Sequence, residues 1–179
     1  MLNPDPHNHS TAFTIREARE EDAEEMLGCI QRLIAEPYKN IPWYPDEFSR
    51  TLDDQRQMIR RFAQETNSLY LVAVGDGQII GEINCKGGER RATRHIALIG
   101  IFVDAAWRGK GVGSALMKEA IAWARANEII TRLELLVYAR NHGAIGMYER
   151  CGFEIEGRRK HAIFQDGEYL DNLMMGLLL

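Results

Sequence analysis

A glycine-rich segment contains the residues of this chain whose types and spacing most clearly indicate chemistry. Gly109, Gly111 and Gly113 alternate with other residues between an apolar run and a predicted helix. Glycine adopts positive φ and lets a ligand approach the backbone closely. A helix start adds unpaired N–H groups and a positive dipole end. With Arg108 and Lys110 beside it, the segment predicts a phosphate or pyrophosphate site.

Other phosphate loops fit this segment less well. A Walker loop requires GxxxxGK[ST], which is absent. A dinucleotide fingerprint requires GxGxxG, but its third glycine position is occupied by Ser114. Glu134 does lie about 20 residues further on, as that fingerprint requires. However, the loop comes late in a chain with room for one strand–helix–strand unit. A glycine-capped turn without a ligand is the remaining alternative for the loop alone.

A second motif follows the helix after the glycine loop. Asn141, Ala144, Tyr148, Gly152 and Phe153 occur where a strand ends, a short helix passes and the next strand begins. Together with residues 108–113, which match the pattern [QR]-x-x-G-x-[GA], this segment resembles the GNAT superfamily of N-acetyltransferases. The resemblance covers roughly residue 13 to the C-terminus.

The resemblance implies acetyl-CoA as co-substrate and assigns residues to it. The pantetheine arm would pair with the backbone of the strand before the loop, the pyrophosphate would take N–H groups of the loop, and Asn141 would contact the cofactor through its side chain. The implied cofactor-binding residues are Ile101, Phe102, Val103, Arg108, Gly109, Lys110, Gly111, Val112, Gly113, Ser114, Asn141 and Tyr148. No metal is implied.

The resemblance also implies direct attack of a neutral amine on the thioester in a ternary complex. Tyr148 would be the general acid for the leaving thiolate, and it shares a helix face with Asn141 and Ala144. The backbone N–H of Val103 would stabilise the oxyanion. The structural alternative is that Tyr148 packs against Phe153 and takes no part in the chemistry.

The general base is less well defined. Many relatives carry a Glu on the central strand where this chain has Leu98. Glu82 is the candidate base, acting through a water, and Glu134 or His95 are alternatives. Each of these side chains could instead be solvated, salt-bridged or structural. The missing Glu also leaves open a catalytically weak module that binds acetyl-CoA as a sensor.

The acceptor is predicted to be a small primary amine such as an amino acid, polyamine, amino sugar or drug. The ending at residues 157–174 resembles members that acetylate polyamines, ribosomal-protein N-termini or free amino acids, so a peptide N-terminus is the alternative acceptor. The resemblance also implies that the proline-rich loop from Tyr38 to Tyr44 lines the acceptor site. In it, Trp43 and Tyr44 are candidate substrate-binding residues, by stacking or cation–π attraction. A packed loop or a dimer contact is the other interpretation of this loop.

The elements that must position these residues follow from periodicity and turn signals. They predict an α+β (mixed α/β) fold with a central, mostly antiparallel, twisted sheet of about seven strands. About four helices flank this sheet, and the resemblance implies that it is splayed at the cofactor site. Strands are expected at 13–16, 69–74, 78–85, 95–103, 133–138, 152–162 and 169–178, and helices at 23–34, 46–64, 111–128 and 142–151. The apolar run 95–103 lacks alternation, which predicts a central strand buried on both faces.

The composition is that of an ordinary single-domain protein. The chain has 179 residues, 45% hydrophobic and 27% charged, with a net charge of -4, which does not favour nucleic-acid binding. Three scattered cysteines and no apolar run of membrane-spanning length indicate a cytoplasmic protein without disulfides, zinc ligands or membrane contact. Residues 1–11 are expected to be a flexible tail before one domain at 12–179. A homodimer is compatible with the resemblance.

Overall fold

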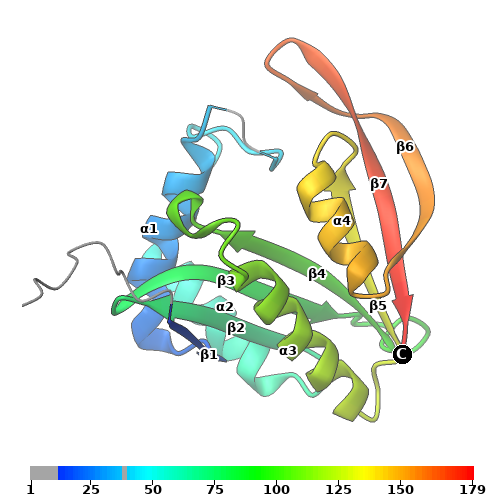
Figure 1. The fold of residues 1–179 in the computed structure, drawn as a ribbon. Coiled ribbons are helices and arrows are strands. Elements are labelled where there is room, and N and C mark those ends of the chain that lie inside the picture. Colours follow the sequence, from blue (N-terminus) through cyan, green and yellow to red (C-terminus); the bar gives the residue numbers. More distant parts are fainter. Residues whose placement is uncertain (1–11, 38–39) are drawn as a thin grey trace, which may run out of the picture.

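One seven-stranded sheet organises the residues described by the computed structural model, which are 12–37 and 40–179 (Figure 1). The tail expected at residues 1–11 lies outside them. The strands are β1 (Phe13–Glu17), β2 (Leu69–Gly75), β3 (Gln78–Gly87), β4 (Ile96–Val103), β5 (Arg132–Tyr138), β6 (Glu154–Gln165) and β7 (Glu168–Leu178). The helices are α1 (Ala23–Ile34), α2 (Leu52–Gln64), α3 (Val112–Ala126) and α4 (His142–Arg150), with 3-10 turns at Glu20–Asp22 and Ala105–Trp107.

The strand order is β1-β2-β3-β4-β5-β7-β6. Every neighbouring pair is antiparallel except β4 and β5, which are parallel because α3 crosses between them. The predicted mixed, mostly antiparallel fold with a strand–helix–strand unit at its centre is therefore confirmed. None of the helices in the described ranges is long and apolar enough to cross a membrane.

The sheet opens between β4 and β5. Their paired register runs from Ile96 with Arg132 to Ile99 with Leu135 and then stops, although both strands continue. Along β4 the backbone groups alternate in direction. The amide of Asp104 donates to the Ile80 carbonyl on the β3 side, so the N–H and C=O of Val103 point toward the opening. The predicted splay is thus present, and it exposes one edge of β4.

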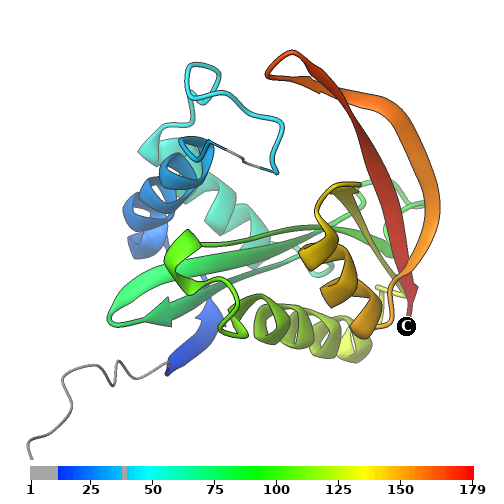
Figure 2. The ribbon, with the colours of Figure 1, turned by 45° about the horizontal axis from the view of Figure 1, so that its top comes forward.

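Helices cover the two faces of the sheet differently (Figures 1 and 2). α3 and α4 pack on one face in the larger core, which includes Leu116, Leu133 and Met175. α1 and α2 pack on the other face over β2 and β3, in a second core that includes Met26, Phe62 and others. The two helix pairs leave between them the region where β4 and β5 diverge.

Three details of the secondary structure differ from the sequence-based expectation. α2 begins at Leu52 instead of residue 46, because Thr51 and Asp54 form a capping box there. β6 continues to Gln165 beyond the expected end at 162. The prediction that β4 is buried on both faces is wrong: Leu98 is 50% exposed, since it lies on the face of α1 and α2 but outside the core that they form. The predicted central place of β4 is confirmed.

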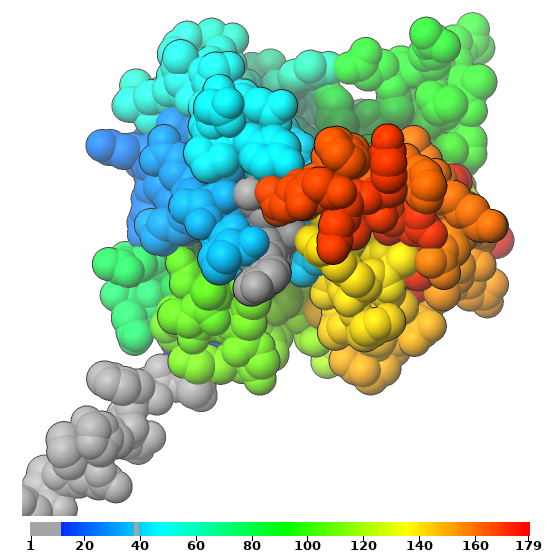
Figure 3. Space-filling model, turned by 90° about the horizontal axis from the view of Figure 1, so that it is seen from above, coloured from blue at the N-terminus to red at the C-terminus, as the bar shows by residue number. Residues whose placement is uncertain are grey.

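The β6–β7 hairpin extends past the rest of the sheet (Figure 1). Two irregularities in its register, between Ile155 and Gly157 and between Arg159 and Ile163, accompany its curvature. Viewed from above, its orange-red tip lies beside the cyan segment that precedes α2 (Figure 3). The hairpin tip thereby contacts a segment that is more than a hundred residues away in the sequence.

Candidate functional site

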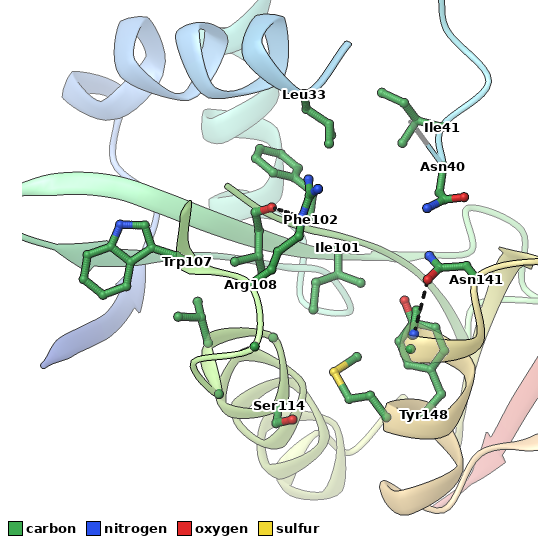
Figure 4. Close-up of a pocket in the computed structure, with 18 of the residues that line it drawn as sticks. Leu33, Asn40, Ile41, Ile101, Phe102, Trp107, Arg108, Ser114, Asn141 and Tyr148 are labelled. Atoms are coloured by element: carbon green, nitrogen blue, oxygen red, sulfur yellow. Dashed lines mark hydrogen bonds between the residues drawn. The ribbon is translucent and has the colours of Figure 1, made fainter. Parts of the chain in front are cut away.

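A pocket of about 560 Å³ occupies the opening between β4 and β5 (Figure 4). Its walls come from the end of α1, the loop after it, the end of β4, the glycine loop with the start of α3, and α4. The residues lining it are Leu33, Glu36, Asn40, Ile41, Ile101, Phe102, Val103, Trp107, Arg108, Gly109, Gly111, Val112, Gly113, Ser114, Asn141, Gly143, Ala144, Met147, Tyr148 and Arg150. The structure thus brings together the two sequence motifs, which lie on opposite sides of one cavity.

The glycine loop presents backbone N–H groups to this pocket. Gly109 and Gly111 have φ values of 74° and 86°, a conformation that other residues adopt only with strain. α3 starts directly afterwards, and its first internal hydrogen bond runs from Ala115 N to Gly111 O. The N–H groups of Val112, Gly113 and Ser114 therefore have no partner within the helix. This concave set of donors fits a pyrophosphate group.

Gly113 also sets the width of the pocket. A Cβ atom added there would lie 3.3 Å from the sulfur of Met147 and 3.6 Å from a methyl carbon of Val103. Glycine therefore keeps a narrow passage open between α3, α4 and the end of β4. Such a passage suits an extended flexible arm running from the loop toward the opening in the sheet.

Arg108 reaches away from the loop and across the pocket. Its Nη1 and Nη2 atoms each lie 2.7 Å from one carboxylate oxygen of Glu36, at the end of α1. Its Nε atom donates to the carbonyl of Val103 at 3.0 Å (Figure 4). Among the described residues that line the pocket, Glu36 is the one acid, so this pair balances the charge of Arg108. The bond to Val103 lies at the open edge of β4.

Tyr148 reaches the pocket from α4. Its side chain is 6% exposed, and burial raises the pKa of its hydroxyl to about 12. The phenol is therefore protonated at neutral pH and able to donate. Its ring also lies 6.0 Å from that of Phe153, so the packing role weighed as the alternative exists beside its place in the pocket. The two roles are compatible, because Tyr148 lines the pocket while its ring packs against Phe153, which does not line the pocket.

Asn141 begins α4. Its side-chain oxygen accepts a hydrogen bond from Ala144 N at 3.3 Å, which caps the helix. The amide NH₂ of Asn141, which donates no bond in this cap, is therefore available to contact a ligand. The second sequence motif, which contains Asn141 and Ala144, therefore stabilises the start of α4 as well as lining the pocket.

Three predicted residues lie outside the pocket lining. Lys110 sits over the ring of Trp107 at 5.0 Å, and it is Trp107 that lines the pocket. Trp43 is 38% exposed and contacts Phe48, while the hydroxyl of Tyr44 accepts a bond from Asp166 N. Asn40 and Ile41, from the same loop as Trp43 and Tyr44, do line the pocket. Of the expected Tyr38–Tyr44 segment, residues 38–39 lie outside the described residues.

Glu82 also lies outside the pocket lining, behind it. It is 3% exposed on β3 and pairs with Phe102, whose side chain lines the pocket. Its Oε1 accepts the Tyr70 hydroxyl at 2.7 Å, whereas Oε2 has no partner among the described residues. Burial raises the pKa of this carboxyl to about 8, partly offset by the bond from Tyr70 and the charge of Arg50. The structure therefore does not bring Glu82 into contact with the cavity.

Several lining residues could not be identified from sequence patterns. Leu33 and Glu36 come from the end of α1 and Met147 comes from α4, whereas Asn40 and Ile41 belong to the loop Tyr38–Tyr44, which was expected to line a substrate site. The helical spacing of α1 predicts that Leu33 is apolar and inward-facing, but not that it meets a loop 70 residues later. Of the residues that the sequence analysis missed, only Met147 could have been found, because it lies inside the second motif.

Comparison with known proteins gives consistent matches. The profile of the Acetyltransferase (GNAT) family matches residues 30–153. The chain is 34% identical over 148 residues to the L-amino acid N-acetyltransferase AaaT of Escherichia coli (strain K12), covering 78% of this chain and 89% of that protein. A GNAT-family acetyltransferase from Streptococcus pneumoniae has a similar structure, with a TM-score of 0.89, 30% identity and coverage of 94% of this chain and 99% of that one.

A further solved structure shares the fold. It is a GNAT superfamily phosphinothricin acetyltransferase from Sinorhizobium meliloti in complex with acetyl-CoA. Its TM-score is 0.82 with 21% identity, over 93% of this chain and 88% of that chain.

Proposed function

The chain belongs to the acetyltransferase (GNAT) family, and from that premise we propose that it transfers the acetyl group of acetyl-CoA to a small primary amine. The observation that carries the proposal is the pocket running from the glycine loop through the opening between β4 and β5. A two-substrate reaction needs such a passage, because the two substrates can meet in it from opposite sides of the sheet.

The cofactor side is held mainly by backbone groups. We assign the pyrophosphate to the N–H groups at the start of α3, with Gly109 and Gly111 shaping the loop. The pantetheine arm pairs with the open edge of β4 at Ile101 and Val103. The Asn141 amide donates to the arm from the other wall. When bound, acetyl-CoA supplies the activated thioester.

The reacting centre lies at the end of β4. The amine attacks the thioester carbonyl directly, and the Val103 N–H, which points into the opening, stabilises the negative charge that develops on the oxygen. The carbon–sulfur bond then breaks and Tyr148 donates its proton to the leaving sulfur, while the proton that the amine loses passes to water, which reprotonates Tyr148. A pKa of about 12 is high for an acid, but the same buried surroundings also raise the proton affinity of a thiolate. A positioned acid of this kind contributes about 10²–10⁴-fold to the rate.

The acceptor class is inferred from the relatives and the acceptor end of the pocket. AaaT is named an L-amino acid N-acetyltransferase, and another relative is a spermidine N(1)-acetyltransferase at 26% identity. The acceptor end contains one acid, Glu36, close to Leu33, Asn40 and Ile41. These features suit a small amine with an apolar part. A peptide N-terminus is the alternative acceptor.

The test is a thiol-release assay with acetyl-CoA and a panel of amino acids, polyamines, amino sugars, aminoglycosides and short peptides. We expect turnover with one group of small amines. Calorimetry with acetyl-CoA is run in parallel. Binding of acetyl-CoA without turnover on any amine would contradict an enzymatic role and favour a sensor. Turnover confined to peptides would support the alternative acceptor.

A further inference from the structure

Arg108 does not direct its side chain to the glycine loop in which it stands. Its Nη1 and Nη2 atoms donate to the two carboxylate oxygens of Glu36 at 2.7 Å each, and its Nε atom donates to the Val103 carbonyl at 3.0 Å. In Figure 4 the guanidinium group lies on the side of Leu33, whereas Ser114 at the start of α3 lies at the opposite side of the pocket. The side chain therefore connects the segment after α1 with the end of β4, and it leaves the N–H groups at the start of α3 to a ligand.

The Val103 carbonyl is a group that the sheet itself does not satisfy. β4 is paired with β5 only as far as Ile99, and beyond it the edge of β4 that faces the opening has no strand partner among the described residues. Val103 is the last residue of β4, and its register partner Gly81 lies on the other side, in β3. Backbone carbonyls in protein interiors are nearly always hydrogen-bonded. Arg108 thus supplies at Val103 the kind of bond that β5 supplies further back along the strand.

A short 3-10 turn fixes the path of the chain from Val103 to Arg108. Asp104 begins this turn: its side chain accepts the N–H of Ala106 at 3.1 Å, and its carbonyl accepts the N–H of Trp107 at 2.9 Å. Because the chain reverses here, Arg108 comes back to within bonding distance of Val103. Its planar guanidinium then has three of its N–H donors engaged by two separate parts of the chain. A flexible ammonium group cannot reproduce this three-point contact.

We infer that the Arg108 side chain is a positioning residue for acetyl transfer: it holds the open edge of β4 at Val103 in place for the thioester and does not bind the pyrophosphate. The inference rests on the proposed function, which puts the reacting thioester and the Val103 N–H together at this edge. A carbonyl oxygen can accept two hydrogen bonds, so the bond from Arg108 persists while the pantetheine arm pairs beside it. A displacement of about 1 Å at a reacting centre can lower the rate about 10²-fold, so the loss of this bond should affect kcat more than affinity.

Two variants are compared with wild type: Arg108→Lys keeps the charge, and Arg108→Gln removes it. The thiol-release assay with an amine from the panel gives kcat and the KM of the acceptor, and calorimetry gives the Kd of acetyl-CoA. We expect kcat to fall about tenfold in both variants, because neither new side chain can bond Glu36 and Val103 together. The Kd of acetyl-CoA should change by no more than about threefold, as for other partly exposed charges.

A direct contact between Arg108 and the pyrophosphate gives a different pattern. Arg108→Gln would then bind acetyl-CoA about tenfold or more weakly with little change in kcat. Arg108→Lys would recover most of that affinity, since a lysine also binds phosphate. A loss of affinity larger than the loss of kcat, or a kcat in Arg108→Lys equal to that of wild type, would overturn the inference.

Gln165→Ala is the matched control for a disturbed acceptor end. Glu36 lines that end, so the loss of Arg108 could act there instead of at β4. Ile41 lines the same end, and its carbonyl accepts the Nε2 atom of Gln165 at 3.0 Å, so Gln165→Ala loosens this end and leaves the β4 edge untouched. We expect this variant to raise the acceptor KM and to keep kcat within about twofold of wild type. A kcat loss as large as that of Arg108→Lys would place the effect at the acceptor end and contradict a role at β4.

A second measurement tests the contact without turnover. If wild type acetylates no amine, the proposed function fails, and NMR exchange of the Arg108 Nε–H with solvent then tests the contact alone. The signal is assigned by its loss in Arg108→Lys. Slow exchange that persists after CoA is added supports the inference. Exchange as fast as that of an exposed arginine, or protection that is lost when CoA is added, would show that Arg108 does not hold Val103 and would refute the positioning role.

Discussion

The two ends of the pocket are built in different ways. At the end proposed for the cofactor, the binding groups come from the backbone: the loop shaped by positive φ at Gly109 and Gly111, the N–H groups at the start of α3, and the open edge of β4. At the acceptor end, they come from side chains that meet across long stretches of sequence. Gln165 and Ile41 are 124 residues apart, and Arg108 and Glu36 are 72 apart.

This difference has a consequence for how each end can vary. Backbone donors keep their positions under most substitutions, because only residues that change φ or fill the passage disturb them. A hydrogen bond or ion pair made by a side chain can be removed by a single substitution that leaves the fold intact. The construction therefore suits an invariant cofactor at one end and an acceptor that differs between relatives at the other.

The largest expected effect tests the reacting centre between the two ends. Tyr148→Phe removes the hydroxyl and keeps the ring against Phe153. We expect kcat to fall about 10²–10⁴-fold, with acetyl-CoA affinity within a factor of two or so of wild type. Tyr138→Phe, on β5 and outside the pocket lining, is the control for loss of a buried phenol. An unchanged kcat in Tyr148→Phe would remove Tyr148 from the mechanism.

A large effect on stability is expected at Glu82, which is buried on β3 behind the pocket lining. Its pKa is raised from 4.5 to about 8 by burial, so the folded state holds the proton more tightly than the unfolded chain. The contribution of Glu82 to the free energy of unfolding is therefore largest below pH 4.5. It decreases as the pH rises toward and through 8. The loss is on the order of 5 kcal/mol when complete.

Glu82→Gln keeps the shape and cannot ionise. Urea unfolding at pH 5, 7 and 9 should show that wild type loses more stability with rising pH than the variant does. Parallel pH dependence in both proteins would mean that Glu82 ionises normally and is not isolated from water. The same variant tests the base role, since an unchanged pH profile of kcat/KM would exclude Glu82 as the proton acceptor.

An intermediate effect tests the backbone construction of the cofactor end. Gly111→Ala places a side chain at φ 86°, which costs roughly 1–2 kcal/mol of strain. Relief of that strain would distort the loop, and we expect acetyl-CoA to bind about tenfold more weakly. Gly143→Ala is the matched control, because Gly143 also lines the pocket, lies in α4 and has open space where its Cβ would be. Equal affinities in the two variants would contradict a conformational role for Gly111.

The same contrast explains what the sequence could and could not predict. The glycine loop, Asn141 and Tyr148 were identifiable because each belongs to a local pattern tied to one strand end or helix start. The confirmed mostly antiparallel sheet and its splay followed from the resemblance and from the strand–helix–strand unit. Trp43 and Tyr44 were expected in the acceptor site from their type and from the loop that contains them. Which face of a proline-rich loop turns inward depends on partners such as Gln165, and no local pattern encodes that pairing.

Glu82 and Leu98 make the same point within the sheet. The alternating strand pattern predicts which residues share a face but not which part of that face a helix covers. α1 and α2 bury Glu82 and leave Leu98 half exposed, although both side chains point to the same side. Sequence alone therefore does not show whether a strand carboxylate can act as the base, because its access to the pocket depends on this tertiary packing.

The smallest expected effect concerns Glu36, which belongs to both ends through Arg108. Glu36→Gln removes the counter-charge of Arg108, and both groups are partly exposed, so the change in free energy is about 0.5–1 kcal/mol. Because the freed guanidinium raises the positive potential beside the glycine loop, acetyl-CoA should bind a few-fold more tightly. A cationic acceptor should bind a few-fold more weakly, because the one acid of the pocket lining is lost.

Calorimetry and KM measurements at low and high salt test both shifts in affinity, since screening should diminish them. Shifts of the same sign in both affinities would mean that Glu36 acts by holding Arg108 and the Val103 carbonyl in place, and not through charge.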